Sequence, residues 1–294
     1  MTVVLVTGAS SGIGLCAAEA FAAAGADVAL MARGRKGLEA AAARVRAHGR
    51  TPLIVAADVT DRAAVEAALD EVRQRLGRLD VVVSCAAATV HGAFVETEPE
   101  QFDRAFSVTF TGAVNVVRAA LPHLEETDGV IVAVGSLVSK VPLPTFASYA
   151  AAKHALRGFL HTLRIELAAQ GSGVRVAQLH PGLVDTPLWD QTAGELPRRP
   201  PYGFDPAEVA DALVALARRP RPDRTFGGDA KALELLWRLA RPAGDAVMVV
   251  LDRYLGSADR GSAGGDILAE GAGTGERRGH VALTRPSLIE ALRR

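Results

Sequence analysis

Short apolar runs alternate with longer helix-forming stretches along most of this chain, and the alternation limits the folds open to it. The runs lie near residues 3, 27, 52, 80, 130 and 174, and each precedes a stretch rich in Ala, Leu, Glu and Arg. Strands that alternate with helices form βαβ units, in which helices cover both faces of a parallel sheet. The runs at 81–83 and 130–132 are continuously apolar, which is typical of strands buried on both faces. The sequence therefore predicts an α/β fold with a doubly wound parallel sheet of six to seven strands.

The βα rhythm divides the 294-residue chain into three parts. It predicts one domain over residues 1–228. Residues 229–255 are expected to form a C-terminal helical extension of two amphipathic helices, separated around Pro242 and Gly244. Residues 256–294 are expected to be a flexible Gly-rich tail with a short helix at its end.

Two further segments have local signals. Residues 97–100 read Thr-Glu-Pro-Glu, with an N-cap residue, a first-turn proline and a carboxylate three residues on, and predict a long helix that ends near Pro122. Residues 187–204 contain four prolines, which predicts a loop or lid rather than a core element.

Composition excludes several classes of function. Lys+Arg and Asp+Glu are 33 each, so the formal net charge is zero, which argues against a nucleic-acid partner or an anionic membrane surface. The two cysteines have no metal-binding spacing, and His154 and His161 share a helical face without a third ligand, so no metal is expected. No leader and no apolar run of roughly 18 residues is present, so we expect a cytoplasmic chain without a membrane span.

A glycine-rich turn follows the first apolar run. It reads Thr7-Gly8-Ala9-Ser10-Ser11-Gly12-Ile13-Gly14 and opens the next helix. Glycines at such a turn allow a pyrophosphate to approach the backbone, and the helix N-terminus favours negative charge. A tight strand-to-helix turn without a ligand is the alternative. The position in the first βα unit favours dinucleotide binding, with these candidate residues: Gly8, Ser10, Ser11, Gly12, Ile13 and Gly14.

The end of the second apolar run indicates which nicotinamide nucleotide is bound. An acidic residue there would bind a ribose 2′-hydroxyl, whereas a basic residue accommodates a 2′-phosphate. The run ends in Arg33, with Arg35 beyond it, and this favours NADP(H) over NAD(H). A solvated arginine-rich turn is the alternative.

Three residues form a candidate catalytic group. Tyr149 and Lys153 are four apart, which places a phenol and an ammonium on one helical face, and Lys153 is one of only four lysines. A nearby cation stabilises a phenolate, so Lys153 would make Tyr149 a usable proton donor and acceptor. Ser136, at the end of the fifth run, can present a hydroxyl to a carbonyl oxygen that gains negative charge.

Together these motifs resemble the short-chain dehydrogenase/reductase family over roughly residues 2 to 228. The further motifs are Asp58-Val59 and Pro181-Gly182-x-Val184-x-Thr186. The resemblance implies a Rossmann-type fold, with Asp58 at the adenine amino group, Lys153 also on the nicotinamide ribose, and residues 181–186 beside the carboxamide. Its remaining candidate cofactor contacts are Val59, Ser84, Ala86, Tyr149, Pro181, Gly182, Val184 and Thr186. We also expect a homodimer or homotetramer.

The chain departs from the family pattern at two places. The family's Asn-Asn-Ala-Gly is replaced by Ser84-Cys85-Ala86-Ala87, so side-chain bonding there must differ. The family's catalytic asparagine falls on Thr109. Asn115 cannot replace it, because six residues turn an α-helix by 600°, which leaves the two side chains 240° apart around the helix axis. A hydroxyl at Thr109 could keep the relay water of that asparagine if the helix backbone also opens.

The sequence thus predicts an NADPH-dependent reductase of a lipophilic ketone or aldehyde, with Tyr149 as proton donor. One alternative is an NAD(P)+-dependent alcohol dehydrogenase working in reverse, and another is a catalytically silent NADPH-binding scaffold. The lipophilic preference follows from an expected apolar pocket wall, near which His91 is a further candidate substrate contact. The wall residues are Val90, Phe94, Leu137, Val138, Leu143, Phe146, Leu183, Leu188 and Trp189. Residues 233–239 are expected to pack on the main domain or on another subunit rather than on a membrane.

Overall fold

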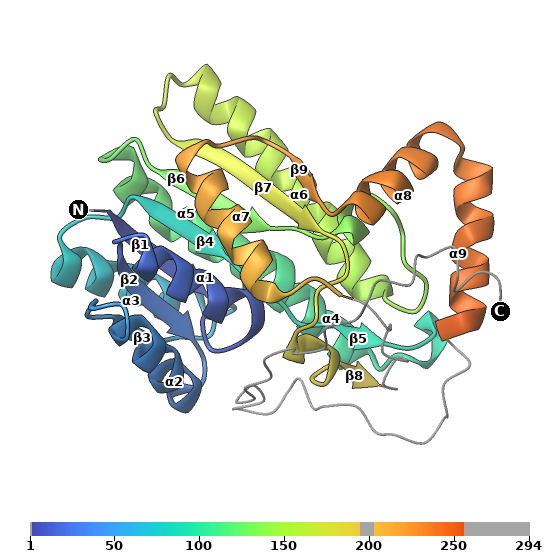
Figure 1. The fold of residues 1–294 in the computed structure, drawn as a ribbon, viewed down its shortest axis with the longest axis horizontal. Helices are drawn as coiled ribbons and strands as arrows, with labels where there is room; N and C mark the ends of the chain where they lie inside the picture. Colours follow the sequence, from blue (N-terminus) through green and yellow to red (C-terminus); the bar gives the residue numbers. More distant parts are fainter. Residues whose placement is uncertain (1, 195–202, 256–294) are drawn as a thin grey trace.

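The computed structural model describes residues 2–194 and 203–255. The seven main strands form one parallel sheet in the order β3-β2-β1-β4-β6-β7-β9 (Figure 1). Their bounds are β1 (Val3–Thr7), β2 (Asp27–Ala32), β3 (Leu53–Ala56), β4 (Val81–Ser84), β6 (Val130–Val134), β7 (Arg175–Pro181) and β9 (Arg224–Phe226). The doubly wound parallel sheet of six to seven strands predicted from the sequence is confirmed, with β9 as its seventh strand.

Helices cover both faces of the sheet (Figure 1). One face carries α1 (Gly12–Ala23), α2 (Arg35–Arg46) and α7 (Pro206–Arg218). The other carries α3 (Arg62–Leu76), α5 (Gly112–Glu125) and α6 (Ala147–Ala169). All residues of β1, β4 and β6 are buried, because apolar side chains on both faces of these strands pack against helices.

The strand order reverses between β1 and β4, which places an open crevice at their carboxyl ends. The strands end in register there, with Thr7 beside Ser84 and Ser84 beside Ala133. The first βα turn and the loop after β4 therefore lie side by side at the crevice.

The helix predicted from residues 97–100 has Glu98, rather than the expected Thr97, as its N-cap. The α4 helix (Pro99–Phe106) has Glu98 at its N-cap, because the Thr97 hydroxyl instead donates to the Ala93 carbonyl at 3.1 Å. The helical path runs through a π-helical segment, η2 (Ser107–Thr111), into α5 and ends at Glu125 rather than near Pro122. Pro122 lies in the last turn, where its missing N–H removes one helical bond without ending the helix.

The loop expected over residues 187–204 contains short regular pieces. A 3₁₀ turn, η4 (Pro187–Trp189), precedes β8 (Ala193–Gly194), which pairs in parallel with β5 (Val90–His91). This two-residue ladder joins the loop after β4 to the loop after β7. Residues 195–202 lie outside the described residues.

Two helices follow β9 within the described residues, and the break between them comes before the expected position around Pro242 and Gly244. They are α8 (Gly228–Leu239) and α9 (Arg241–Leu255), so the break falls at Ala240 and Pro242 and Gly244 lie in the first turn of α9. The predicted linker and terminal helix of residues 256–294 lie outside the described residues. Within the described ranges, no helix has the length and apolar character needed to cross a membrane.

Candidate active site

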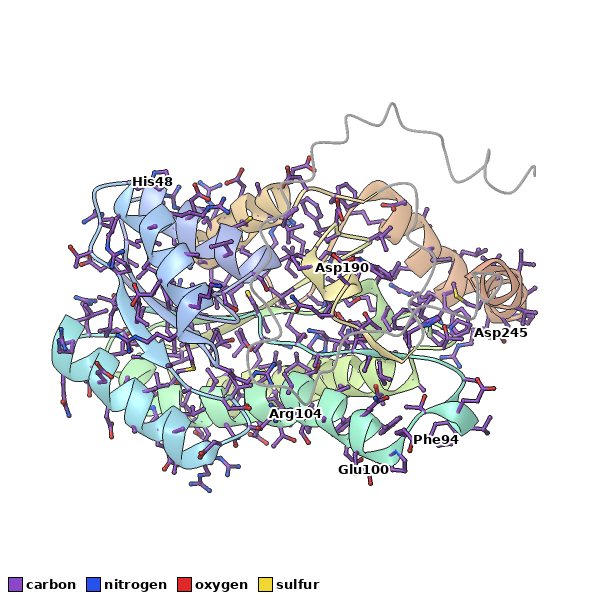
Figure 2. The ribbon with its side chains drawn as sticks, turned by 90° about the horizontal axis from the view of Figure 1, so that it is seen from below. His48, Phe94, Glu100, Arg104, Asp190 and Asp245 are labelled. Carbon is purple, nitrogen blue, oxygen red and sulfur yellow. The ribbon has the colours of Figure 1, made fainter. Side chains whose placement is uncertain are left out.

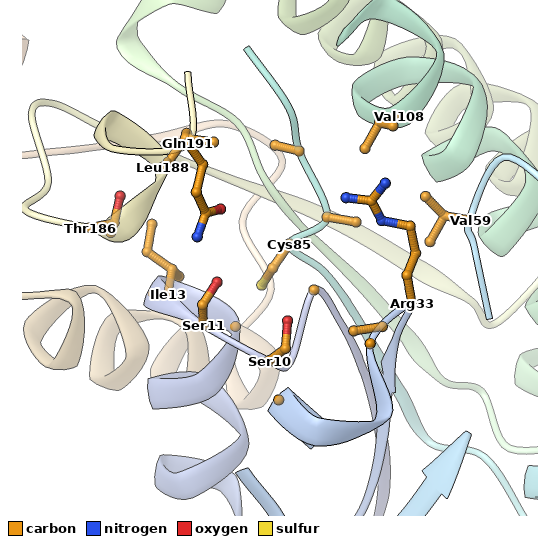
Figure 3. Close-up of a pocket in the computed structure, with 18 of the residues that line it drawn as sticks. Ser10, Ser11, Ile13, Arg33, Val59, Cys85, Val108, Thr186, Leu188 and Gln191 are labelled. Carbon is orange, nitrogen blue, oxygen red and sulfur yellow. The ribbon is translucent and has the colours of Figure 1, made fainter. Parts of the chain in front are cut away.

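A cleft lies at the carboxyl ends of β1, β2 and β4 (Figure 3). Eleven of the sequence-predicted cofactor residues line it: Gly8, Ser10, Ser11, Gly12, Ile13, Gly14, Arg33, Asp58, Val59, Ala86 and Thr186. Ser84, Tyr149, Lys153, Pro181, Gly182 and Val184 are not among its lining residues. The residues that the sequence analysis did not assign to it include Gly37, Cys85, Val108 and Gln191.

Two glycines of the turn have no room for a side chain. A Cβ on Gly8, whose φ is +66°, would lie 2.9 Å from the Ala86 nitrogen, and one on Gly14 would lie 2.2 Å from the Gly8 carbonyl oxygen. Ser11 makes no side-chain cap bond at the N-terminus of α1. The first N–H groups of α1 are therefore open toward the cleft, and this cradle fits the pyrophosphate of a dinucleotide.

Arg33 extends from the end of β2 across the cleft. Its guanidinium points toward Val59 and Val108 on the opposite wall (Figure 3). Arg35, by contrast, is 74% exposed and pairs with Glu39 along α2. Of these two arginines, Arg33 is therefore the one placed to meet a nucleotide.

Asp58 is held in place by two neighbours. One carboxylate oxygen accepts the Thr60 N–H at 2.9 Å, and the other lies 2.5 Å from the Arg104 guanidinium of α4. Burial opposes ionisation, but the hydrogen bonds from Arg104 and Thr60 outweigh it and lower the pKa of Asp58. Arg104 has no distinctive sequence context, so sequence reasoning missed it.

Two hydroxyl groups hold the loop after β4. Thr7 Oγ1 accepts the N–H groups of Cys85 and Ala86 at 3.1 and 3.3 Å. Thr109 Oγ1 accepts the Ala88 N–H at 3.1 Å and donates to the Ala88 carbonyl at 3.0 Å. Threonine hydroxyls thus fix the main chain at Cys85, Ala86 and Ala88, within and directly after the segment where the family's pattern has asparagines.

Thr109 lies in the π-helical segment η2 and is fully buried. The helix backbone does open here, as a relay at this position would need. However, the single hydroxyl proton goes to Ala88, which leaves the hydroxyl with accepting capacity only. Asn115 instead donates to the Val59 carbonyl at 3.0 Å and so holds the loop after β3.

Ser136, Tyr149 and Lys153 meet at the ends of β6 and α6. Ser136 caps the 3₁₀ turn η3 (Leu137–Ser139) and hydrogen-bonds Tyr149. Lys153 is 2% exposed, donates to the Val134 carbonyl at 2.7 Å, and lies 5.5 Å from the Tyr149 ring centre. The three candidate catalytic side chains are therefore in one place.

Burial shifts the pKa of each ionisable group in this place. It raises the pKa of Tyr149 to about 12, against the hydrogen bond from Ser136. It lowers the pKa of Lys153 to about 8. It also raises the pKa of Cys85 to about 12, so this cleft-lining cysteine is a neutral thiol. At neutral pH Tyr149 is protonated and Lys153 is charged.

The segment after β7 crosses the cleft. Gly182 donates to the Phe226 carbonyl, Val184 pairs with Phe204, and Thr186 lines the cleft beside Gly12. Gln191 follows η4 and points its amide into the cleft near Ser11 (Figure 3). Its residue type carries no motif, so only its place in the fold reveals it.

Part of the expected apolar wall forms an aromatic cluster. The Phe146 ring lies 4.9 Å from His91 and 6.0 Å from Trp189, measured between ring centres. Phe146 precedes α6 and lies three residues before Tyr149. Phe94, by contrast, is 69% exposed and packs edge-on against Phe102 at the outer surface (Figure 2).

The described residues contain no group of three or more His, Cys, Asp or Glu side chains placed to hold a metal ion. His161, which the sequence placed on a face with His154, lies 3.3 Å from Asp223.

The parallel sheet, the glycine cradle and the crevice are those of a dinucleotide-binding α/β protein. A family model described as "short chain dehydrogenase" matches residues 2–196. The chain belongs to this family.

Comparison with known proteins agrees with that assignment. The uncharacterized oxidoreductase YxnA of Bacillus subtilis is 32% identical over 266 residues, covering 88% of this chain and 75% of the relative. An alcohol dehydrogenase from Thermococcus sibiricus complexed with 5-hydroxy-NADP is similar with a TM-score of 0.69 at 31% identity, covering 77% of this chain and 95% of that one. A short chain dehydrogenase from Mycobacterium paratuberculosis bound to NAD gives 0.68 at 26% identity, with 76% and 95% covered.

Proposed function

We propose that the chain is an NADPH-dependent reductase that converts a lipophilic ketone or aldehyde to an alcohol. The observation that carries the proposal is the meeting of Ser136, Tyr149 and Lys153 at the carboxyl edge of the sheet that also forms the nucleotide cleft. A silent scaffold would not need a buried phenol and ammonium in contact.

Arg33 supports the choice of nucleotide. Its guanidinium projects across the cleft from the end of β2, where a ribose 2′-phosphate would be recognised. The glycine cradle and the open N-terminus of α1 would hold the pyrophosphate. Asp58 and Thr186 also line this cleft, and we assign them to the adenine and the carboxamide respectively.

The proposed mechanism assigns one task to each side chain. When bound, the nucleotide would supply the hydride. Ser136 donates a hydrogen bond to the substrate carbonyl oxygen as negative charge develops on it. Tyr149 then transfers its proton to that oxygen, and its raised pKa keeps the proton in place at neutral pH. The Lys153 ammonium stabilises the phenolate left on Tyr149.

The aromatic cluster supports an apolar substrate. Phe146 and Trp189 lie beside the first turn of α6, which carries Tyr149. Rings in this position would remove apolar carbon atoms from water, whereas they offer no ion pair to a charged metabolite.

The test is a panel of lipophilic ketones and aldehydes in which NADPH oxidation is followed by absorbance. Sustained turnover of at least one compound is expected, together with weaker activity on matched carboxylated analogues. Binding of NADPH without turnover of any carbonyl, or of any alcohol with NADP+, would instead identify a scaffold.

A further inference from the structure

A cluster of charged side chains packs against the loop that carries Ser136. Its members come from four parts of the fold that are distant in sequence: the end of η3, α6, β7 and the segment from Asp223 to α8. They are Lys140, Arg157, His161, His180, Asp223 and Glu234. None of these residues lines the nucleotide cleft.

Asp223 is the centre of the cluster. Its carboxylate lies 2.5 Å from Lys140, 2.8 Å from Arg157 and 3.2 Å from the Nε2 atom of His180. Burial opposes its ionisation, but the hydrogen bonds from His180, Lys140 and Arg157 outweigh it and lower the pKa of Asp223. The carboxylate is therefore charged across the working pH range.

His180 connects this carboxylate to the Ser136 loop. The imidazole is fully buried, with Nδ1 2.7 Å from Ser139 Oγ and 3.3 Å from the Ser136 carbonyl oxygen. A Cβ on Gly135 would lie 2.3 Å from the same Nδ1 atom. The ring is thus packed directly on the Gly135-Ser136 main chain.

Ser139 links the His180 ring to the Ser136 carbonyl. Its hydroxyl donates its one proton to that carbonyl at 2.5 Å, and the same oxygen lies 2.7 Å from His180 Nδ1. Burial lowers the pKa of His180, so its ring is neutral. Asp223 lies against the other ring nitrogen at 3.2 Å, so the ring is held between the carboxylate and the Ser136 loop.

Lys140 ties the same loop to α8. Its ammonium donates to Thr225 at 2.8 Å and to Glu234 of α8 at 3.0 Å, while its other side faces Asp223. With 7% of its side chain exposed, Lys140 is a buried charge matched by two carboxylates. Residues 136–140 are consequently held from both ends.

We propose that Asp223 and His180 are positioning residues, which hold the Ser136 main chain so that its hydroxyl and that of Tyr149 converge on the substrate carbonyl. Glu234 completes the cluster and makes α8 part of the same support. The inference rests on the proposed reductase function for its kinetic effect, and on the contacts alone for its effect on the loop.

Two substitutions of His180 separate its contact with Ser139 from its contact with Asp223. His180→Asn keeps a polar atom near the position of Nδ1 and loses the contact with Asp223. His180→Gln keeps a donor near Nε2 and loses the contact with Ser139. Because small displacements of a catalytic group reduce rate steeply, we expect kcat to fall by about 10- to 100-fold in His180→Gln and by less in His180→Asn.

Two further readouts distinguish positioning from general stabilisation. The Kd for NADPH should stay within about twofold, since the cluster does not line the cleft. Hydrogen exchange at the amides of residues 137–141 should accelerate in His180→Gln.

Lys231→Gln is the matched control, since it removes an exposed charge from α8 and should leave all readouts unchanged. If the His180 variants do not fold, Glu234→Gln tests the cluster from its half-exposed edge, with smaller effects in the same direction.

Unchanged kcat together with unchanged exchange in His180→Gln would overturn the inference. Absence of carbonyl turnover by the wild type would overturn the proposed function, while the exchange measurement would still decide whether His180 holds the loop.

Discussion

The Lys153 ammonium lies 5.5 Å from the centre of the Tyr149 ring, one turn further along α6. Burial raises the pKa of Tyr149 to about 12, so a phenolate formed there depends on stabilisation by its neighbours. Lys153 is the nearby cation that can supply it, and the lysine is itself restrained by the Val134 carbonyl. The pair therefore combines a phenol that keeps its proton at neutral pH with a fixed positive charge.

The first prediction concerns that donor. Tyr149→Phe keeps the ring and removes the proton, so carbonyl reduction should slow by about 100-fold or more. The Kd for NADPH, measured by fluorescence titration, should change little because Tyr149 is not among the cleft-lining residues. Full turnover in this variant would exclude Tyr149 as the proton donor.

The second prediction concerns pH. Lys153 has a pKa lowered to about 8, so its charge is present below pH 8 and is lost as the pH rises above it. The value of kcat/KM for carbonyl reduction, which reports groups of the free enzyme, should be level between pH 6.5 and 7.5 and fall about tenfold per pH unit well above 8. A profile that stays level to pH 10 would contradict the assigned role of the ammonium.

The third prediction concerns nucleotide choice. Arg33→Asp removes a cation that would bind the 2′-phosphate, and a charge-assisted bond contributes about 1.5 to 3 kcal/mol. The preference for NADPH over NADH, measured as a ratio of Kd values, should therefore fall by about 10- to 100-fold. Arg35→Asp is the control, because Arg35 is exposed and pairs with Glu39, and it should keep the preference. Equal affinities of the wild type for both nucleotides would remove the argument.

The fourth prediction concerns Thr109. Thr109→Val keeps the shape but leaves the half-buried Ala88 N–H and carbonyl without their partner, which should cost about 1 to 3 kcal/mol of unfolding free energy. Turnover should also fall, since the loop after β4 loses its anchor, whereas Thr109→Ser should keep both properties. Chemical denaturation and steady-state rates provide the test, and a Val variant as stable and active as the wild type would show that the anchor has no importance.

The fifth prediction concerns Gln191, whose amide points into the cleft. Loss of one neutral hydrogen bond in Gln191→Ala should weaken NADPH binding by about fivefold. Gln191→Glu should weaken it further, because a carboxylate would face the phosphates. Gln170→Ala, an exposed substitution after α6, serves as control. If the Glu variant binds NADPH as the wild type does, Gln191 does not contact the nucleotide.

Periodicity predicted the elements whose signal is long and repeated. The continuously apolar runs of β4 and β6 appear where the sequence indicates them. In contrast, β5 and β8 have two residues each, too few for any periodic pattern. Their pairing is a consequence of tertiary structure.

Motifs predicted the site where function restricts both residue type and spacing, as for Tyr149 and Lys153. The contacts that support these residues could not be predicted from motifs. Arg104 reaches Asp58 from 46 residues away, and His180 reaches Asp223 across 43 positions, through side chains that many sequences carry without such partners. Only the folded arrangement distinguishes these contacts from ordinary surface charges.

The ladder between β5 and β8 has a consequence for engineering. Because Val90 pairs with Ala193 and His91 with Gly194, the loop after β4 and the loop after β7 are one mechanical unit. A graft that replaces either loop alone with that of another enzyme would leave the remaining strand without its partner. Attempts to transplant substrate preference into or out of this scaffold therefore need to exchange both loops together.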